Sequence, residues 1–294
     1  MSLATAPHRG LGLEVHCQRV VLLYPSDEGD VAALRGIDLD IEPGEALAIL
    51  GPSGSGKSSL LALLAGLIKP SSGRVRLGDR DLGQMTGREL ARMHASSVSL
   101  VLQDPTRNLL PYASAIQNVE FAQRLGKARA GTQVRPARQL LEQLGLSELG
   151  SRAVASLSGG EQQRVAIAAS ISLGPELLLV DEPTNQLDGD NRDVVLELLL
   201  GVNRELGTTL VCVTHDQAVA DALPRTVNIR DGLVGAEGRL GQTYAVVSRE
   251  GTIDLPPDVL EVLPPGTLVK VVRRGQGAEL INRDLDESGE TVSL

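Results

Sequence analysis

The 294-residue sequence has no tryptophan, one phenylalanine and only two cysteines. A core without large aromatic rings must be built from Leu, Val, Ile and Ala, and the 42% hydrophobic content is that of an ordinary globular protein. Cys17 and Cys212 lie far apart in apolar, strand-like surroundings. We therefore expect two buried, reduced thiols in a cytosolic protein rather than a disulfide.

Long apolar runs are also missing. Because no stretch of 18 or more apolar residues occurs, we expect no membrane-spanning helix, and the start, MSLATAPHRGLGLEVH, lacks the apolar segment of a signal peptide. The formal net charge of -9 argues against a general nucleic-acid-binding protein, since phosphate backbones require a basic surface. If the protein acts at a membrane, we expect another chain to hold it there.

The sequence does contain two segments suited to binding phosphate. The first, GPSGSGKSS, fits the pattern G-x-x-x-x-G-K-[ST], in which backbone N–H groups wrap the phosphates of a nucleotide. Lys57 supplies a positive charge for the β- and γ-phosphates, and Ser58 is an expected Mg²⁺ ligand. The residues before it predict a strand and those after it a helix. We therefore predict a nucleotide site at Gly51, Pro52, Ser53, Gly54, Ser55, Gly56, Lys57, Ser58 and Ser59.

Four further polar residues follow apolar runs that predict strands. Asp181 and Glu182 end one such run. We expect Asp181 to hold Mg²⁺, and Glu182, on the other face, to be the general base that activates water. His215 can bind the γ-phosphate and orient that water, with a structural histidine as the alternative. The amide oxygen of Gln103 can bind Mg²⁺ reversibly, with a surface glutamine as the alternative.

The second phosphate-binding segment is LSGGEQQR at Leu157–Arg164. Ser158, Gly159, Gly160 and Glu161 begin a predicted helix, and the N–H groups and dipole of a helix N-terminus favour an anion. One chain does not need two such sites for one triphosphate. We expect the second site to close on the nucleotide of another copy, which gives a head-to-tail homodimer with two ATP molecules at its interface.

In order and spacing, these motifs and the turn Asn185–Asp188 resemble the nucleotide-binding subunit of ABC transporters. The resemblance covers roughly residues 13–235, and LSGGEQQR is highly specific for that family. It implies an α/β fold of the P-loop NTPase class, with a mixed or parallel core sheet and a helical subdomain at about residues 104–165. It also implies ATP and Mg²⁺ as cofactors, and ATP hydrolysis coupled to transport or mechanical work.

The same resemblance implies roles for residues outside the phosphate-binding segments. Tyr24 would stack on adenine, with a core tyrosine as the alternative. Asp188 would communicate across the dimer. The loop after Gln103 would contact a separately encoded integral membrane permease, which would place the protein on the inner face of the cell membrane.

Within the family, VAALRGIDLDIEPGEALAILGPSGSGKSSLL, NLLPYASAIQNVEF and DEPTNQLD are most similar to the lipoprotein-release, macrolide-export and cell-division group. That subgroup implies export or mechanotransmission. Ala168, Ala169 and Ser170 stand where an arginine is familiar, which departs from the family's pattern.

Composition predicts three parts: a disordered N-terminus at residues 1–12, the ATPase domain at 13–235, and a small, mostly β module at 236–294. The module resembles swapped-hairpin barrels of the AbrB kind. Because its basic and acidic residues are mixed, we expect a dimerising or regulatory role rather than DNA binding, with a plain structural appendage as the alternative. Two alternatives to a transporter subunit are a soluble non-transport ABC ATPase and an ATP-switched regulator that uses this module.

Overall fold

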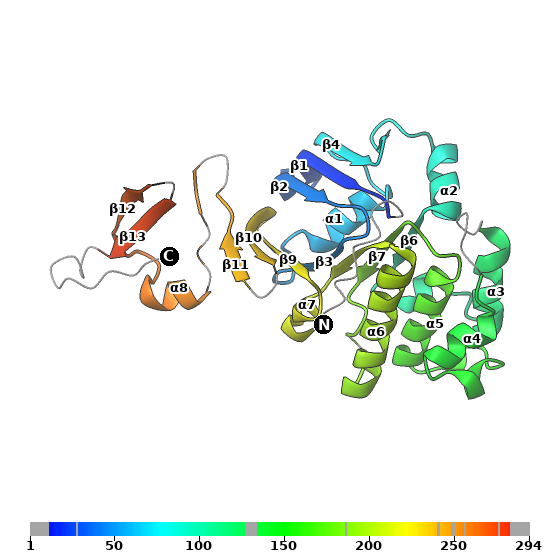
Figure 1. The fold of residues 1–294 in the computed structure, drawn as a ribbon. Coiled ribbons are helices and arrows are strands. Elements are labelled where there is room, and N and C mark those ends of the chain that lie inside the picture. The colour runs from blue at the N-terminus through cyan, green and yellow to red at the C-terminus, as the bar shows by residue number, and fades with distance from the viewer. Residues whose placement is uncertain are drawn as a thin grey trace, which may run out of the picture. The chain divides into compact units, whose positions relative to one another are not determined.

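The computed structural model describes residues 12–27, 29–126, 134–185, 187–239, 242–247, 251–253, 255, 257–275 and 277–282 (Figure 1). The chain divides into two compact units, Met1–Tyr244 and Ala245–Leu294. The expected disordered N-terminus, apart from Gly12, and the acidic C-terminal end lie outside the described residues. Among the residues described, no helix combines the length and the apolar character needed to cross a membrane.

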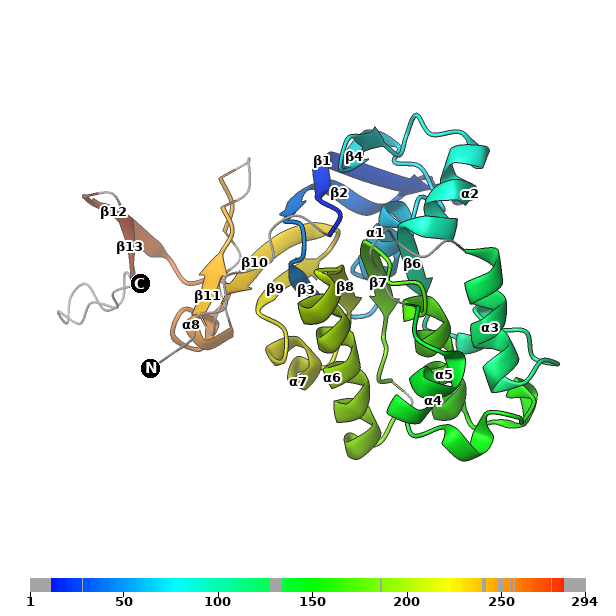
Figure 2. The same ribbon diagram turned by 45° about the vertical axis from the view of Figure 1, so that its right-hand side comes forward.

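The larger unit is built on a seven-stranded sheet of order β11-β10-β9-β3-β8-β7-β6 (Figure 2). Strands β6, β7, β8, β3 and β9 pair in parallel, and β10 pairs antiparallel with β9, so the sheet is mixed as expected. The strand bounds are β3 Ala46–Leu50, β6 Val98–Val101, β7 Leu177–Asp181, β8 Thr209–Val213, β9 Arg225–Arg230, β10 Leu233–Arg239 and β11 Gln242–Ala245.

The central strands β3, β7 and β8 are apolar apart from Asp181 at the end of β7 and Thr209 at the start of β8, because both faces of the sheet are buried. In β3, Ala46 and Ala48 pack into the core on one face, whereas Leu47 and Ile49 pack into the core on the other. This alternation follows from the two-residue period of a strand.

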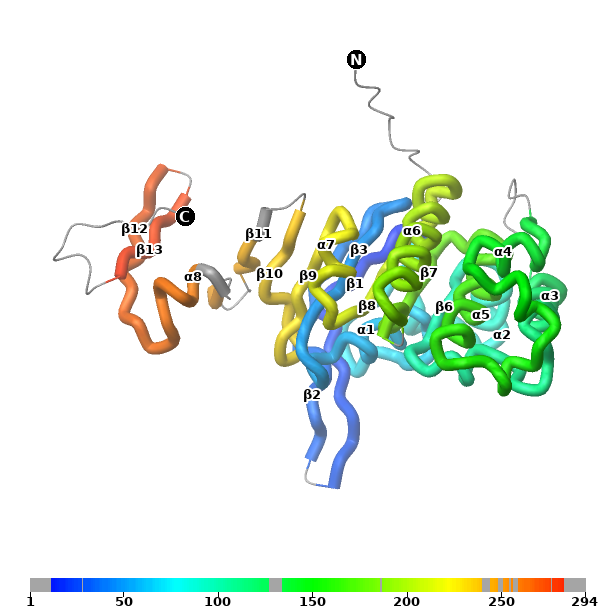
Figure 3. Tube along the Cα trace, turned by 90° about the horizontal axis from the view of Figure 1, so that it is seen from below, coloured from blue at the N-terminus to red at the C-terminus, as the bar shows by residue number. Residues whose placement is uncertain are grey.

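A four-stranded antiparallel sheet of order β2-β1-β4-β5 and helix α1 share the core of the Leu47 face. Figure 3 shows the long strands β1 and β2 side by side. The bounds are β1 Val15–Tyr24, β2 Val31–Ile41, β4 Ser72–Leu77, β5 Arg80–Asp81, α1 Lys57–Leu64 and α2 Gly87–Ser96. This arrangement brings the end of β1, with Tyr24, to the helix that follows the phosphate-binding segment.

Helices cover the Ala46 face, and residues of α3, α4, α5, α6 and α7 share its core. Their bounds are α3 Ala115–Leu125, α4 Ala137–Gln143, α5 Gly159–Ile171, α6 Gly189–Leu206 and α7 Gln217–Asp221. Short 3₁₀ turns at Pro105–Arg107, Ser147–Leu149 and Val154–Ser156 connect them. The helical subdomain expected at about residues 104–165 corresponds to α3, α4 and the start of α5.

The structure differs from the expected boundary at residue 235. The sheet continues through β10 and β11, because β10 pairs along its length with β9, and the larger unit ends at Tyr244. A β-like composition therefore does not mark the domain boundary here.

The smaller unit contains one helix and one hairpin among its described residues: α8 Pro257–Val262, β12 Val269–Arg274 and β13 Gly277–Asn282. Leu263 and Ile281 are its buried apolar side chains, and an isolated bridge joins Val247 to Ile253. A single two-stranded hairpin gives no support to the resemblance to swapped-hairpin barrels.

Candidate functional site

Four neighbouring strands end at one edge of the main sheet. Ile49 pairs with Val213, and Val213 in turn pairs with Asp181. Val101 of β6 pairs with Val180, so Gln103 follows β6 at the same edge. Because the carboxyl ends of parallel strands meet at one edge, the topology collects the polar residues predicted from four separate parts of the sequence. These residues are Gly51, Gln103, Asp181, Glu182 and His215.

The phosphate-binding loop needs glycine for geometric reasons. Gly51 has φ of 153°, and a Cβ there would lie 2.1 Å from the carbonyl oxygen of Ile229. Gly56 has φ of 101°, and a Cβ there would lie 2.4 Å from the carbonyl oxygen of Ala33. Only glycine fits both the torsions and the close backbone approach.

Lys57, the first residue of α1, is held inside this loop. Its Nζ donates hydrogen bonds to the carbonyl oxygens of Gly51 (2.7 Å) and Pro52 (2.9 Å), and the residue is 7% exposed. Burial lowers the pKa of Lys57, while the carboxylates of Glu182 and Asp181 raise it. The loop therefore surrounds a cation with backbone groups, which is suited to an anionic ligand.

Asp181 ends β7 and is 7% exposed. Burial raises its pKa, whereas a hydrogen bond from Ser58 lowers it. Its Oδ1 is buried and has no hydrogen-bond partner within the described structure. An orphaned carboxylate oxygen beside a hydroxyl fits Mg²⁺, a cation that prefers oxygen ligands. The described residues hold no cluster of three or more His, Cys, Asp or Glu side chains for a metal, so phosphate and water would complete the coordination.

Glu182 adopts φ of 49°, a left-handed conformation that is uncommon for a residue with a Cβ. Its backbone N–H donates to Val213 O at 2.9 Å. Its Oε1 lies 2.8 Å from His215 Nδ1, and its Oε2 accepts from Thr214 Oγ1 at 3.4 Å. The two adjacent carboxylates thus face different partners. Strain of this kind is retained where surrounding contacts hold it, often at functional sites.

Tyr24 is 42% exposed, and its hydroxyl lies 3.3 Å from Ser59 Oγ. The aromatic ring is therefore at the surface beside α1 rather than in the core, which excludes the alternative of a core tyrosine. Gln103 is exposed after β6. Its role as a Mg²⁺ ligand stays a prediction.

The second phosphate-binding segment lies at the N-terminus of α5. Ser158 Oγ accepts from the Glu161 N–H, and Glu161 Oε2 accepts from the Ser158 N–H, which makes a capping box. These hydrogen bonds lower the pKa of Glu161. The carboxylate of Glu161 is thus used to start the helix, and its predicted contact with ATP stays a prediction.

A hollow of about 370 Å³ opens at this helix end. Asp188 lies at its rim as the N-cap of α6, where the Asn191 N–H donates to its Oδ1 at 3.0 Å and lowers its pKa. No residue of the Gly51–Ser59 loop lines it. The lining residues are Ser158, Gly159, Gly160, Glu161, Arg164, Leu187, Asp188 and Asn191.

Two residues of the site were absent from the predicted set. Arg164 lines the hollow, is 8% exposed and has a buried Nε without a partner among the described residues. Its place as the last residue of LSGGEQQR was the available signal. Thr214, which bonds Glu182, was signalled only by its position before His215.

The fold and this site together define a P-loop ATPase. The chain belongs to the ABC transporter family, whose characteristic sequence matches residues 34–185. It is an ATP-binding, ATP-hydrolysing protein that uses Mg²⁺, and the α/β P-loop fold is confirmed.

Relatives and solved structures support this assignment. The chain is 43% identical over 211 residues to the lipoprotein-releasing system ATP-binding protein LolD 2 of Caulobacter vibrioides. The aligned region covers 71% of this chain and 91% of that protein. It is 41% identical over 229 residues to the macrolide export ATP-binding/permease protein MacB of Sodalis glossinidius, covering 78% of this chain and 35% of that one. A dimeric, post-hydrolysis structure of the cassette MJ0796 bound to ADP and Pi matches with a TM-score of 0.69 and 34% identity, covering 77% of this chain and 98% of that chain.

Proposed function

We propose that this chain is the ATPase subunit of an ABC transporter in which two copies close head to tail around two ATP molecules. Closure and reopening would drive a separately encoded membrane permease in export or mechanotransmission. The names of the relatives, a lipoprotein-releasing system and a macrolide exporter, favour this class of work.

The observation that carries the proposal is the separation of the two phosphate-binding segments. The hollow at the start of α5 is lined by Ser158, Gly160, Arg164 and Asp188, and by no residue of the chain's own phosphate loop. A helix N-terminus with a buried arginine suits the phosphates of a nucleotide presented by another molecule. The dimeric state of the MJ0796 cassette supports a second copy as that molecule.

Within one site we assign the following roles. Lys57 and the loop N–H groups bind the phosphates, and Ser58, Asp181 and Gln103 hold Mg²⁺. The ion neutralises charge on the phosphates when it is bound. Glu182 accepts a proton from the attacking water, His215 orients that water through its contact with Glu182, and Tyr24 stacks on the base.

For the permease contact, we propose the surface that follows Gln103. Tyr112 is 80% exposed, and Phe121 and Leu125 of α3 are 45% and 66% exposed. Phe121 and Leu125 are four residues apart and so share one face of α3. Large exposed apolar side chains of this kind are typical of a protein interface. Such an interface would bring the subunit to the inner face of the cell membrane.

For the smaller unit, residues 245–294, we propose a dimerising or regulatory role. Val262, Leu268 and Val271 are 45%, 62% and 65% exposed. A unit of this size buries little surface by itself, and apolar residues left at its surface favour a partner.

The test is capture of the partner by a trapped subunit. Tagged Glu182→Gln protein, with ATP, is purified from detergent-solubilised membranes of the source cells, and co-purifying proteins are identified by mass spectrometry. We expect a multi-spanning permease, and weaker capture when Tyr112→Ala is added. Lys57→Ala, which cannot hold ATP, is the matched control and should capture less.

Recovery of soluble proteins alone would contradict the transporter reading. It would favour a non-transport ABC ATPase or a regulator that acts through residues 245–294. Nucleic acid in the captured material would favour the same alternatives.

A further inference from the structure

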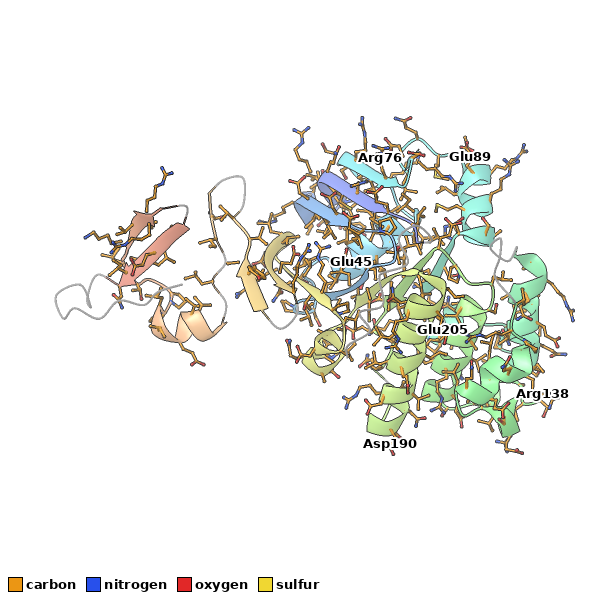
Figure 4. All side chains as sticks on the ribbon, viewed as in Figure 1. Glu45, Arg76, Glu89, Arg138, Asp190 and Glu205 are labelled. Atoms are coloured by element: carbon orange, nitrogen blue, oxygen red, sulfur yellow. The ribbon has the colours of Figure 1, made fainter. Side chains whose placement is uncertain are left out.

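An ion pair outside every motif joins the two halves of the site. Arg192 is the fourth residue of α6, and its Nη1 lies 3.3 Å from Asp216 Oδ2. Asp216 directly follows His215 in the chain. The side chains of Arg192 and Asp216 are 35% and 36% exposed. Figure 4 labels Asp190 at the end of α6 where Arg192 lies, and Glu205 at the opposite end.

Asp216 fixes the turn that carries His215. Its Oδ1 accepts from the Ala218 N–H at 2.9 Å and so caps α7, which leaves Oδ2 for Arg192. Its own backbone N–H donates to Thr214 Oγ1 at 3.0 Å. That hydroxyl donates to Glu182 Oε2, and His215 Nδ1 contacts Glu182 Oε1. A shift of Asp216 would therefore move both neighbours of the Glu182 carboxylate.

Arg192 is also connected to the residues that line the hollow at the start of α5. The Arg192 N–H donates to the carbonyl oxygen of Asp188 at 2.9 Å, in the first turn of α6. Asp188 and Asn191 line the hollow, and Asn191 holds the Asp188 carboxylate through two hydrogen bonds. Hydrogen bonds and one ion pair thus connect Asp188 to Glu182 through Arg192, Asp216 and Thr214.

We infer that Arg192 is a positioning residue. When a second copy binds at Asp188, Arg192 transmits that change to the positions of Glu182 and His215. The inference rests on the proposed head-to-tail dimer. A half-exposed ion pair contributes little to stability, so a purely structural role predicts little effect of its loss. A positioning role predicts slower hydrolysis with unchanged binding, because the ion pair touches neither the phosphate loop nor Tyr24.

The experiment measures ATPase turnover, its Hill coefficient, ATP affinity and thermal midpoint for full-length variants. Arg192→Gln should lower kcat about 5- to 20-fold, in the lower part of the ordinary range of coupling between sites, and bring the Hill coefficient toward one. ATP affinity and thermal midpoint should stay near wild type. Arg204→Gln, in the last turn of the same helix, is the matched control and should behave as wild type.

A double-mutant cycle identifies the partner. Asp216→Asn keeps an oxygen that can cap α7 but removes the charge, and should resemble Arg192→Gln. The double variant should be no slower than either single one, and Arg192→Lys should recover part of the rate. Additive losses, or an Arg192→Gln rate within twofold of wild type, would overturn the inference.

Failure of the inference and failure of the proposed function give different results. Wild-type protein that hydrolyses ATP without cooperativity would overturn the proposed dimer. Cooperative wild-type hydrolysis that Arg192→Gln leaves intact would overturn the role of Arg192 alone. If Arg192→Gln lowers the thermal midpoint and Arg192→Lys does not restore it, the ion pair serves only as a structural contact. That result would also contradict the inference.

Discussion

The two phosphate-binding helix starts are built in opposite ways. Helix α1 begins after Gly56, which has a left-handed conformation and makes no side-chain cap. Helix α5 begins with the capping box of Ser158 and Glu161. The first N–H groups of α1 have no side-chain cap and are left for a ligand. The capping box of α5 uses the N–H groups of Ser158 and Glu161 and leaves those of Gly159 and Gly160 for the proposed second nucleotide.

The chemical groups around the two helix starts also differ. Lys57 is the first residue of α1, the charges of Glu182 and Asp181 act on it, and Glu182 contacts His215. These residues include a cation, a candidate metal ligand and a candidate base. The α5 start opens on a hollow with Arg164 and Asp188 but no general base of the Glu182–His215 kind. This difference supports the proposed dimer, in which the α1 start contains the candidate catalytic residues and the α5 start would close on the nucleotide of another copy. The following four changes test that division. The two with the largest expected effects on nucleotide binding and turnover come first, and the two that alter stability by about 1 kcal/mol follow.

Lys57→Ala should remove the cation from the uncapped helix start. We expect ATP affinity to fall at least ~100-fold, because loss of a buried partner of a charged group costs several kcal/mol. Calorimetric titration with ATP and Mg²⁺ measures this. Lys69→Ala is the control, since Lys69 is exposed and its Nζ donates a hydrogen bond to the carbonyl oxygen of Gly83, away from the phosphate-binding loop. Wild-type affinity in Lys57→Ala would show that the loop does not bind phosphate in the way we describe.

Glu182→Gln should separate binding from chemistry at the same end. We expect near-normal ATP affinity but turnover at least ~100-fold slower, since general-base catalysis contributes about that factor. Phosphate release in steady state is the measurement, and Glu197→Gln on α6 is the control. Near-normal turnover in Glu182→Gln would exclude it as the base.

Ser158→Ala should damage only the capped end. Removing the cap should cost about 1 kcal/mol of stability, and ATP-dependent dimer formation should weaken in a Glu182→Gln background. Ser114→Ala is a closely matched control, because Ser114 caps α3 in the same way, with its Oγ accepting from Gln117 N at 3.3 Å. Dimer mass with and without ATP is measured by light scattering. Equal dimer formation by the two variants would remove Ser158 from the interface.

Asp181→Asn should raise the stability of the nucleotide-free protein but abolish hydrolysis. Because burial raises the native pKa of Asp181, the folded state binds a proton more readily than the unfolded state. The cost of the buried charge is therefore relieved as pH falls through that raised pKa. At neutral pH we expect Asp181→Asn to gain roughly 1 kcal/mol in the free energy of unfolding without nucleotide. Mg²⁺-dependent hydrolysis should be lost.

Urea unfolding at neutral and acid pH measures the stability change, which should shrink on the acid side. The exposed Asp79→Asn is its control. A loss of stability in Asp181→Asn would show that attraction to Lys57 outweighs the cost of burial.

Much of the site could be predicted because its residues lie in short contiguous patterns. The loop Gly51–Ser59 carries its own geometric reasons, since glycine torsions and close approach are local requirements. Asp181 and Glu182 could be predicted because an apolar run followed by two carboxylates indicates the end of a buried strand. Residues that act through long-range contacts gave weaker signals: Thr214 and Arg192 look like ordinary polar residues until β8 and α6 are placed in the fold.

The boundary of the larger unit shows the same limit. Residues after 235 have the alternation of β-strands, a composition that by itself predicts the start of another module. Whether such a strand joins an existing sheet depends on the edge that it meets, and β10 pairs with β9. Local pattern contains no information about that partner.

The sequence by itself determined the phosphate loop, the order of strands and helices, and the family, because each depends on neighbouring residues with fixed spacing. Only the tertiary structure decided that four strand ends share one edge, that the carboxylate of Glu182 meets Thr214 and His215, and that Arg192 meets Asp216. Those contacts join segments that are far apart in the chain. Their partners are chosen by packing and sheet order rather than by any local preference.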